Sequence, residues 1–132
     1  MNLAYIRKAR DWLVSVQNRD GGWGESCTSY DKGEYVPLHH STPSQTAWAL
    51  IGLLSCRGKN HEPAIEKGVR YLLKHQRTDG GWDEPEWTAT GFPRHFYLRY
   101  DYYRLYFPLL ALGRFVTSKT GRKFRSNVSA TA

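Results

Sequence analysis

The chain has 132 residues, which is the size of one small domain or of one part of a larger protein. Hydrophobic residues make up 40% of it, which excludes an intrinsically disordered chain, and no apolar run approaches the roughly 20 residues that a membrane-spanning helix needs. The formal net charge of +7 permits nucleic acids, anionic lipids or phosphates as partners but selects none of them.

Helices alternate with glycine-rich turns and long loops along the predicted chain. The first helix is predicted over residues 2–17, where apolar residues recur near helical spacing until the sequence "DGG" ends the pattern. Residues 24–41 follow as a long irregular loop. A loop of this length is usually functional or packed under a neighbouring element.

The second helix has a well-marked start. Thr42 is placed to cap the helix, Pro43 fits its first position, and Gln45 stands where a capping box needs it. The run "SQTAWALIGLLSC" is apolar on most faces, which is typical of a buried helix. Pro63 opens a third helix, "PAIEKGVRYLLKHQ", which ends before a second "DGGW".

The remaining third of the chain is predicted as a loop, a helix and a tail. Residues 83–95 are irregular, and no strand is predicted. The last helix is predicted over residues 100–116, with Pro108 expected to kink or split it. Residues 117–132 are rich in Lys and Arg and are predicted to form a basic, disordered tail.

One seven-residue segment occurs twice. "QNRDGGW" begins at Gln17 and ends at Trp23, and "QRTDGGW" runs from Gln76 to Trp82 at the same offset. The matching helices before both segments indicate a duplicated α/α module that stacks on its neighbours to bury a shared core. The glutamine amide is expected to satisfy a helix end, with the tryptophan ring covering it. These four residues are therefore predicted to be structural.

The repeated pattern K-A/G-x-x-aromatic-Leu-x-x-x-Gln-x-x-x-Gly-x-Trp resembles the QW motif of the triterpene cyclases. "GGWGESCTSY", "STPSQTAWALIGLL", "DGGWDEPEWTATGFP" and "FYLRYDYYRLYFPLLALGRF" resemble, in order, the C-terminal end of squalene–hopene cyclases. The resemblance implies an all-α fold, a partial α/α barrel (toroid) built from QW-type helical repeats. Residues 1–116 are expected to be the C-terminal part of such a barrel.

That family folds squalene in an apolar cavity, protonates a terminal double bond and closes rings through carbocations. The acid is the middle aspartate of an Asp-x-Asp-Asp motif, which none of the aspartates of this chain matches: Asp11, Asp20, Asp31, Asp79, Asp83 and Asp101. We therefore expect a cyclase fragment that is inactive by itself, and we assign it no catalytic residue.

The resemblance implies that part of this chain lines the cavity. Phe92 and Phe96 would offer cation–π faces, and Tyr30 would approach from the first loop. The remaining residues of the implied wall are Gly91, Leu98, Tyr100 and Tyr103. Read without the family, the same aromatic cluster is ordinary core for the last helix. Arg94 and Arg99 depart from the family and are expected to point outward, because a cation would oppose carbocation chemistry.

The implied partners are a squalene-like polyprenyl substrate and the remainder of the cyclase or a partner subunit. "MNLAYIRKARDW" lacks the apolar core of a signal peptide, so we expect a cytoplasmic protein that associates peripherally (monotopically) with the membrane. No nucleic-acid module fits the sequence. No cofactor or metal is expected, because Cys27, His39, His40 and Glu25 do not reproduce a zinc-site spacing.

Two further functions stay open. An open array of four helices would leave an apolar face uncovered, which is typical of a non-catalytic helical module that binds another protein. The protein prenyltransferases are related α/α barrels, so a prenyl-chain-binding or prenyltransferase-like protein is the other alternative. Stoichiometric zinc would favour it.

Overall fold

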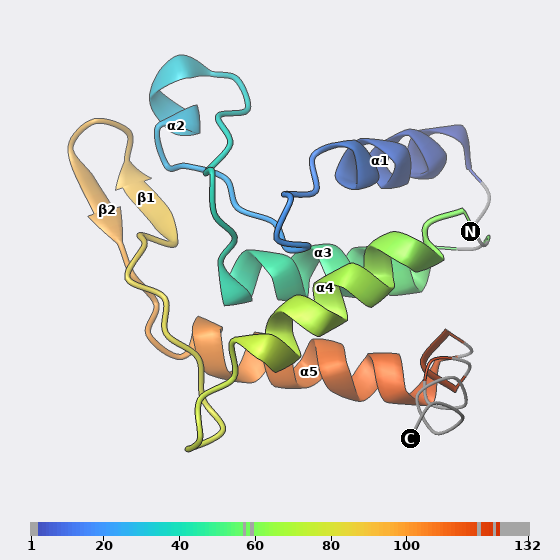
Figure 1. The fold of residues 1–132 in the computed structure, drawn as a ribbon. Coiled ribbons are helices and arrows are strands. Elements are labelled where there is room, and N and C mark those ends of the chain that lie inside the picture. The colour runs from blue at the N-terminus through green and yellow to red at the C-terminus, as the bar shows by residue number, and fades with distance from the viewer. Residues whose placement is uncertain (1–2, 57, 59, 119, 123, 125–132) are drawn as a thin grey trace.

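The computed structural model describes residues 3–56, 58, 60–118, 120–122 and 124. α3 lies at the centre of the helical layer and packs against α1, α4 and α5 (Figure 1). A short helix and a two-stranded hairpin project from the same side of that layer. The elements, in chain order, are α1 (Ala4–Ser15), α2 (Ser29–Lys32), α3 (Pro43–Ser55), α4 (Glu62–Lys74), β1 (Ala89–Phe92), β2 (Phe96–Leu98) and α5 (Tyr103–Thr117).

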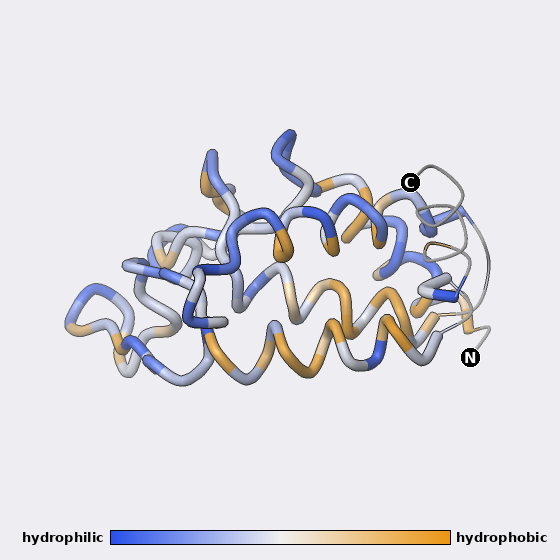
Figure 2. The backbone as a smooth tube through the Cα atoms, turned by 60° about the horizontal axis from the view of Figure 1, so that its bottom comes forward, coloured by the Kyte–Doolittle hydropathy of each residue, from blue (hydrophilic) through white to orange (hydrophobic). Residues whose placement is uncertain are grey.

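The core lies between α3 and the two helices beside it. Burying each of its large apolar side chains contributes about 1.5–3 kcal/mol. Figure 2 shows hydrophobic positions gathered along the helices and hydrophilic ones in the projecting loops. The buried residues include Ala47, Leu50 and Leu53 of α3, Ile65, Val69 and Leu72 of α4, and Ala111 and Phe115 of α5.

The start of α3 has the predicted cap. The Thr42 hydroxyl accepts the Gln45 N–H at 3.4 Å, and Pro43 occupies the first turn. The reciprocal half of the capping box is absent, because the Thr42 N–H donates to the Trp23 carbonyl instead. The Gln45 amide is thereby released to bond both backbone groups of Glu25, at 2.6 and 3.0 Å. The start of α3 therefore also holds the first long loop.

The prediction that the chain has no strand is wrong. β1 and β2 form an antiparallel hairpin with an irregularity between Thr90 and Phe92. Gly91 and Pro93 resemble loop residues, since both are disfavoured within strands. Thr90 and Phe92 nevertheless pair with Tyr97 and Phe96, which are β-forming aromatic residues. Arg94 turns the chain with a positive φ of 66°.

Pro108 was predicted to kink or split the last helix, and the split does not occur, because α5 continues through this proline. Proline removes one backbone hydrogen bond and usually breaks a helix interior. Here Pro108 is buried, and Ala111 and Phe115 on the same helix are in the core. Packing along α3 therefore stabilises the helix on both sides of the proline.

The predicted disordered tail, residues 117–132, lies mostly outside the described residues. Within the part that is described, Gly121 is buried and the Phe124 ring lies edge-on to Phe115, with 5.5 Å between centroids. The guanidinium of Arg70 stands 4.7 Å from the centre of the Phe124 ring. Contact with the core therefore extends beyond the end of α5.

Candidate functional site

Each long loop leaves the helical layer from a turn of the same geometry. The Gln17 amide donates to the Gly21 carbonyl at 2.7 Å, and the Gln76 amide donates to the Gly80 carbonyl at 2.9 Å. Both glycines have positive φ, at 94° and 85°. Such a conformation is strained for any other residue type, so each "DGG" sequence fits its turn.

The tryptophan of each turn satisfies the end of the preceding helix. The Trp23 indole N–H donates to Leu13 in the last turn of α1 at 2.7 Å, and that of Trp82 donates to Leu72 of α4 at 2.8 Å. Carbonyls in a last helical turn lack intrahelical partners. Both indoles are buried, with exposed fractions of 4% and 2%. The indole, and not the glutamine amide as predicted, therefore satisfies the end of each preceding helix.

The second loop is fixed to α3 by a buried carboxylate. Glu84 accepts the Ser44 N–H at 2.8 Å and the Ser44 hydroxyl at 2.6 Å, in the first turn of α3. A negative charge is favourable at a helix N-terminus. Burial nevertheless raises the pKa of Glu84, against the lowering effect of the two bonds to Ser44. The same helical end therefore holds both loops, one through Gln45 and the other through Ser44.

The two loops also contact each other directly. His40 Nε2 lies 2.6 Å from Glu86 Oε1, and the Cys27 thiol donates to the Trp87 carbonyl at 3.3 Å. Burial raises the pKa of the Cys27 thiol, and the charge of Glu25 adds to the effect. No cluster of His, Cys, Asp and Glu suited to a metal ion occurs in the part of the chain that the structure describes.

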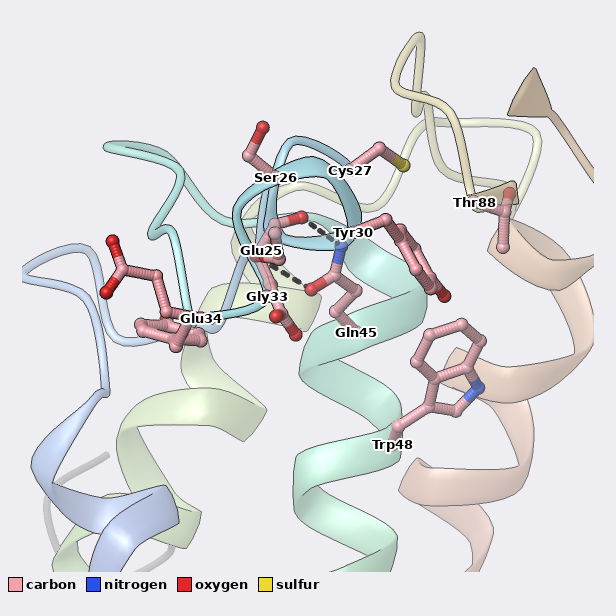
Figure 3. Close-up of a pocket in the computed structure, with 11 residues that line it drawn as sticks. Glu25, Ser26, Cys27, Tyr30, Gly33, Glu34, Gln45, Trp48 and Thr88 are labelled. Atoms are coloured by element: carbon pink, nitrogen blue, oxygen red, sulfur yellow. Dashed lines mark hydrogen bonds between the residues drawn. The ribbon is translucent and has the colours of Figure 1, made fainter. Parts of the chain in front are cut away.

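A cavity of about 450 Å³ lies between the first loop, α3 and the start of the hairpin segment. Figure 3 shows the Tyr30 ring pointing toward the Trp48 indole, with Thr88 beyond them. Tyr30 therefore lines this cavity. The cavity is also lined by Glu25, Ser26, Cys27, Ser29, Gly33, Glu34, Tyr35 and Gln45.

An aromatic cluster continues from Trp48 onto α5. The Trp48 ring packs edge-on against Tyr103 at 5.8 Å and Phe107 at 5.4 Å, and Tyr100 stacks on Tyr103 at 4.7 Å between centroids. Tyr103 therefore contacts a residue of the cavity lining, Trp48, and Tyr100 packs behind Tyr103, but neither tyrosine lines the cavity itself. Sequence reasoning missed Trp48 and Phe107, because both lie in apolar helical runs that indicate core. Their aromatic character was the one available signal.

A model of the squalene–hopene cyclase C-terminal domain matches residues 1–117. The chain belongs to this family. It is 55% identical over 114 residues to the squalene–hopene cyclase of Bradyrhizobium diazoefficiens, covering 83% of this chain and 17% of that protein. Identity to the squalene–hopene cyclase of Alicyclobacillus acidocaldarius is 56% over 92 residues, covering 70% of this chain and 14% of that protein.

A dammaradiene synthase is similar over a larger share of this chain. The dammaradiene synthase of Dryopteris crassirhizoma is 45% identical over 136 residues, which covers 91% of this chain and 19% of the synthase. The cyclase-family chain therefore spans less than a fifth of the length of each of these relatives. No helix among the described residues is both long and apolar enough to cross a membrane.

The other predicted wall residues of this cyclase-family chain lie on the hairpin. Phe92 and Phe96 pack edge-on with centroids 5.5 Å apart and are 63% and 46% exposed. A side chain at Gly91 would clash with the Phe96 ring, and Leu98 is half-buried. The hairpin residues do not line the cavity beside Tyr30. The predicted wall thus divides into a tyrosine group near Trp48 and an exposed phenylalanine pair.

The two arginines that depart from the family pattern are exposed and bonded to acidic residues. Arg94 donates to the Asp31 carbonyl at 2.9 Å, and Arg99 lies 3.2 Å from the Asp101 carboxylate. Neither arginine lines the cavity beside Tyr30. That placement agrees with the expectation that they point outward.

Proposed function

We propose that the chain forms the C-terminal part of the α/α barrel of a squalene–hopene-type cyclase. In this proposal its loops supply part of the cavity wall in which a squalene-like polyprenyl substrate is cyclised. Membership of the family supports the proposal, and so do two turns with equivalent hydrogen bonds, as stacked QW repeats require. The observation that carries it is the aromatic cluster around Trp48 beside a cavity.

The wall has a defined chemical task. Carbocations formed during ring closure need stabilisation by groups that do not add to them as nucleophiles. Aromatic faces meet this need through cation–π attraction, which is stronger in a desolvated site. Phe92 and Phe96 would supply such faces, and Tyr100 and Tyr103 would shape the adjoining surface. Because no Asp-x-Asp-Asp motif is present in this sequence, the initiating acid would come from the remainder of the cyclase or from a partner subunit.

The first test uses the chain as it is. Incubated with squalene, the purified chain should give no polycyclic product by gas chromatography. Formation of hopene or another polycycle would show that the chain contains its own initiating acid.

A cytoplasmic, peripheral location stays a prediction. It is tested by whether the reconstituted enzyme sediments with vesicles.

The second test replaces the matching segment of the Alicyclobacillus acidocaldarius cyclase with residues 5–116 of this chain. The chimera should cyclise squalene. Phe96→Ala should lower its turnover by roughly 30-fold, the equivalent of a cation–π attraction of about 2 kcal/mol. Trp87→Ala is the matched control, because Trp87 is an exposed aromatic residue of the same segment that lies outside the proposed wall. A folded chimera in which both variants behave alike would reject the wall assignment.

One observation favours the alternative of an interaction module. Leu109 is 67% exposed on α5, and Tyr106 and Leu110 beside it line an apolar groove. Exposed apolar patches of this kind mark surfaces that bind a partner. Light scattering on the purified chain tests it. A monodisperse monomer that binds no apolar dye would argue against this alternative.

A further inference from the structure

One residue of the first long loop, Asp31, contacts the exposed β1–β2 hairpin at two points. Asp31 lies in α2, and its Oδ2 accepts the Tyr97 hydroxyl of β2 at 3.0 Å. Its backbone carbonyl accepts from Arg94 Nη2 at 2.9 Å, in the turn that joins the two strands. A single residue of the first loop therefore contacts both the second strand and the tip of the hairpin.

The second carboxylate oxygen of Asp31 strengthens this assignment. Asp31 Oδ1 is buried and has no hydrogen-bond partner, but Arg94 Nε stands 4.0 Å from it. A buried acceptor without a partner is unfavourable unless an opposite charge is near. The Arg94 side chain thus balances the Asp31 charge while it bonds the Asp31 backbone.

Arg94 also has an unusual backbone. It is the one residue other than glycine with positive φ among the residues that the structure describes. Such a conformation persists only where the surroundings hold it in place. Arg94 is held by its contacts to Asp31 and by a backbone hydrogen bond to Tyr97, so the shape of the hairpin turn is coupled to its attachment to α2.

Few other contacts among the described residues could position the hairpin. Neither strand contributes a residue to the buried core, and both are exposed or half-buried. The contacts of Glu86 with His40 and of Trp87 with Cys27 fix only the segment before β1. The Thr88 N–H donates to the Leu98 carbonyl at 2.8 Å and closes the base of the hairpin, without tying it to the first loop.

We infer that Asp31 is a positioning residue that fixes the β1–β2 hairpin, and with it the Phe92 and Phe96 rings, against the first loop. It acts through the Tyr97 hydroxyl and the Arg94 guanidinium. This inference rests on the proposed function for the use made of the two rings. Its structural part, the attachment of the hairpin to α2, is independent of any cyclase activity.

Hydrogen exchange measured by mass spectrometry on the 132-residue chain tests the structural part. In Asp31→Ala and in Tyr97→Phe, amides of residues 88–98 should exchange about tenfold faster than in the wild type, with those of α3 unchanged. Asp31→Asn should retain most of the protection, because its amide oxygen can accept the Tyr97 hydroxyl. Asp101→Ala is the matched control, since it removes a carboxylate bonded to Arg99 and not to the hairpin.

Hairpin exchange within about twofold of wild type in both Asp31→Ala and Tyr97→Phe would overturn the inference. So would equal acceleration in Asp101→Ala. If Asp31→Ala fails to fold, Tyr97→Phe alone decides, because it removes a single hydroxyl from a residue outside the core.

The functional part is tested in the chimeric cyclase. Asp31→Ala and Tyr97→Phe should lower kcat with little change in KM, in the same direction as expected for Phe96→Ala, and should raise the share of incompletely cyclised products. Asp101→Ala should leave the product ratio unchanged. If Asp31→Ala and Tyr97→Phe exchange faster in the hairpin but leave the products unchanged, the positioning role is rejected. A wild-type chimera without activity would count against the proposed function. The exchange data would still test the attachment of the hairpin to α2.

Discussion

The turn from Gln17 to Trp23 and the turn from Gln76 to Trp82 make the same internal hydrogen bonds but meet different surroundings. Gln17 donates a second hydrogen bond, to the Ala64 carbonyl of α4 at 2.9 Å, whereas Gln76 is exposed and has no second bond in the described structure. The short sequence therefore determines the turn itself. Whether the turn is also covered depends on the neighbouring helices.

The aspartates of the two turns show the same difference. Asp20 accepts the Ser41 N–H at 3.1 Å and the Ser41 hydroxyl at 2.6 Å, so it joins the first turn to the segment before α3. Asp79 pairs with Arg77, two residues away in its own turn. The first turn is thus bonded to distant segments, and the second mainly to itself.

The largest effect should come from the tryptophans, in which the two turns agree. Both rings are buried, so Trp23→Ala and Trp82→Ala should each destabilise the chain by about 3–5 kcal/mol. Urea unfolding would measure the loss. Trp→Phe at each position is the control, since it keeps most of the ring and removes the indole N–H. A loss below about 1 kcal/mol at either site would show that its ring is not packed as described.

The next largest loss of stability should differ between the two turns, and it concerns their second glycines, Gly22 and Gly81. A Cβ added at Gly22 would lie 2.5 Å from Ser41 Cβ and from Thr46 Oγ1, whereas at Gly81 its nearest contact would be the end of the Leu105 side chain at 3.3 Å. Gly22→Ala should therefore cost about 1–3 kcal/mol by overpacking, and Gly81→Ala less than about 1 kcal/mol. The same unfolding experiment decides. Equal losses would mean that the first turn is no more enclosed than the second.

A smaller difference is expected at the glutamines. Gln17→Ala removes two part-buried hydrogen bonds and should cost about 1–2 kcal/mol, whereas Gln76→Ala removes one exposed bond and should cost about 0.5 kcal/mol. Thermal unfolding at neutral pH can resolve the two variants. Equal losses, or the reverse order, would contradict the role of the bond from Gln17 to Ala64.

The smallest effect should depend on pH. The Gly81 N–H and then Arg77 lower the pKa of Asp79 from its usual value of 3.8. A lowered folded-state pKa gives a contribution that is complete above that usual value and is lost as the pH falls through the folded pKa. Asp79→Asn should therefore lower Tm slightly at neutral pH, and the gap from wild type should close below about pH 4. A gap that widens in acid would contradict this linkage.

Much of the helical fold could be predicted from the sequence, because its signals are local. Thr42 and Pro43 mark the start of α3, and the two glycine-rich turns follow shortly after the ends of α1 and α4. The hairpin could not be predicted, since its turn at Arg94 is held by Asp31, which is far away in the sequence. The continuity of α5 through Pro108 also depends on tertiary structure, because packing along α3 outweighs the lost backbone bond.

The candidate site was predictable only in part. Resemblance to a family indicated Tyr30, and the structure places it on a cavity. Tyr100 and Tyr103 were indicated in the same way, and both join the cluster around Trp48. Trp48 itself was missed, because an aromatic residue in an apolar helix indicates core. The contacts between the two loops, such as that of Cys27 with Trp87, depend on tertiary structure that no local pattern encodes.

Both long loops are attached to the same helical turn, one through Gln45 and the other through Ser44. That turn is a common attachment point for two segments that lie far apart in the sequence. A tilt of α3 would therefore move both loops together, so the space between the two loops would change its orientation more readily than its width.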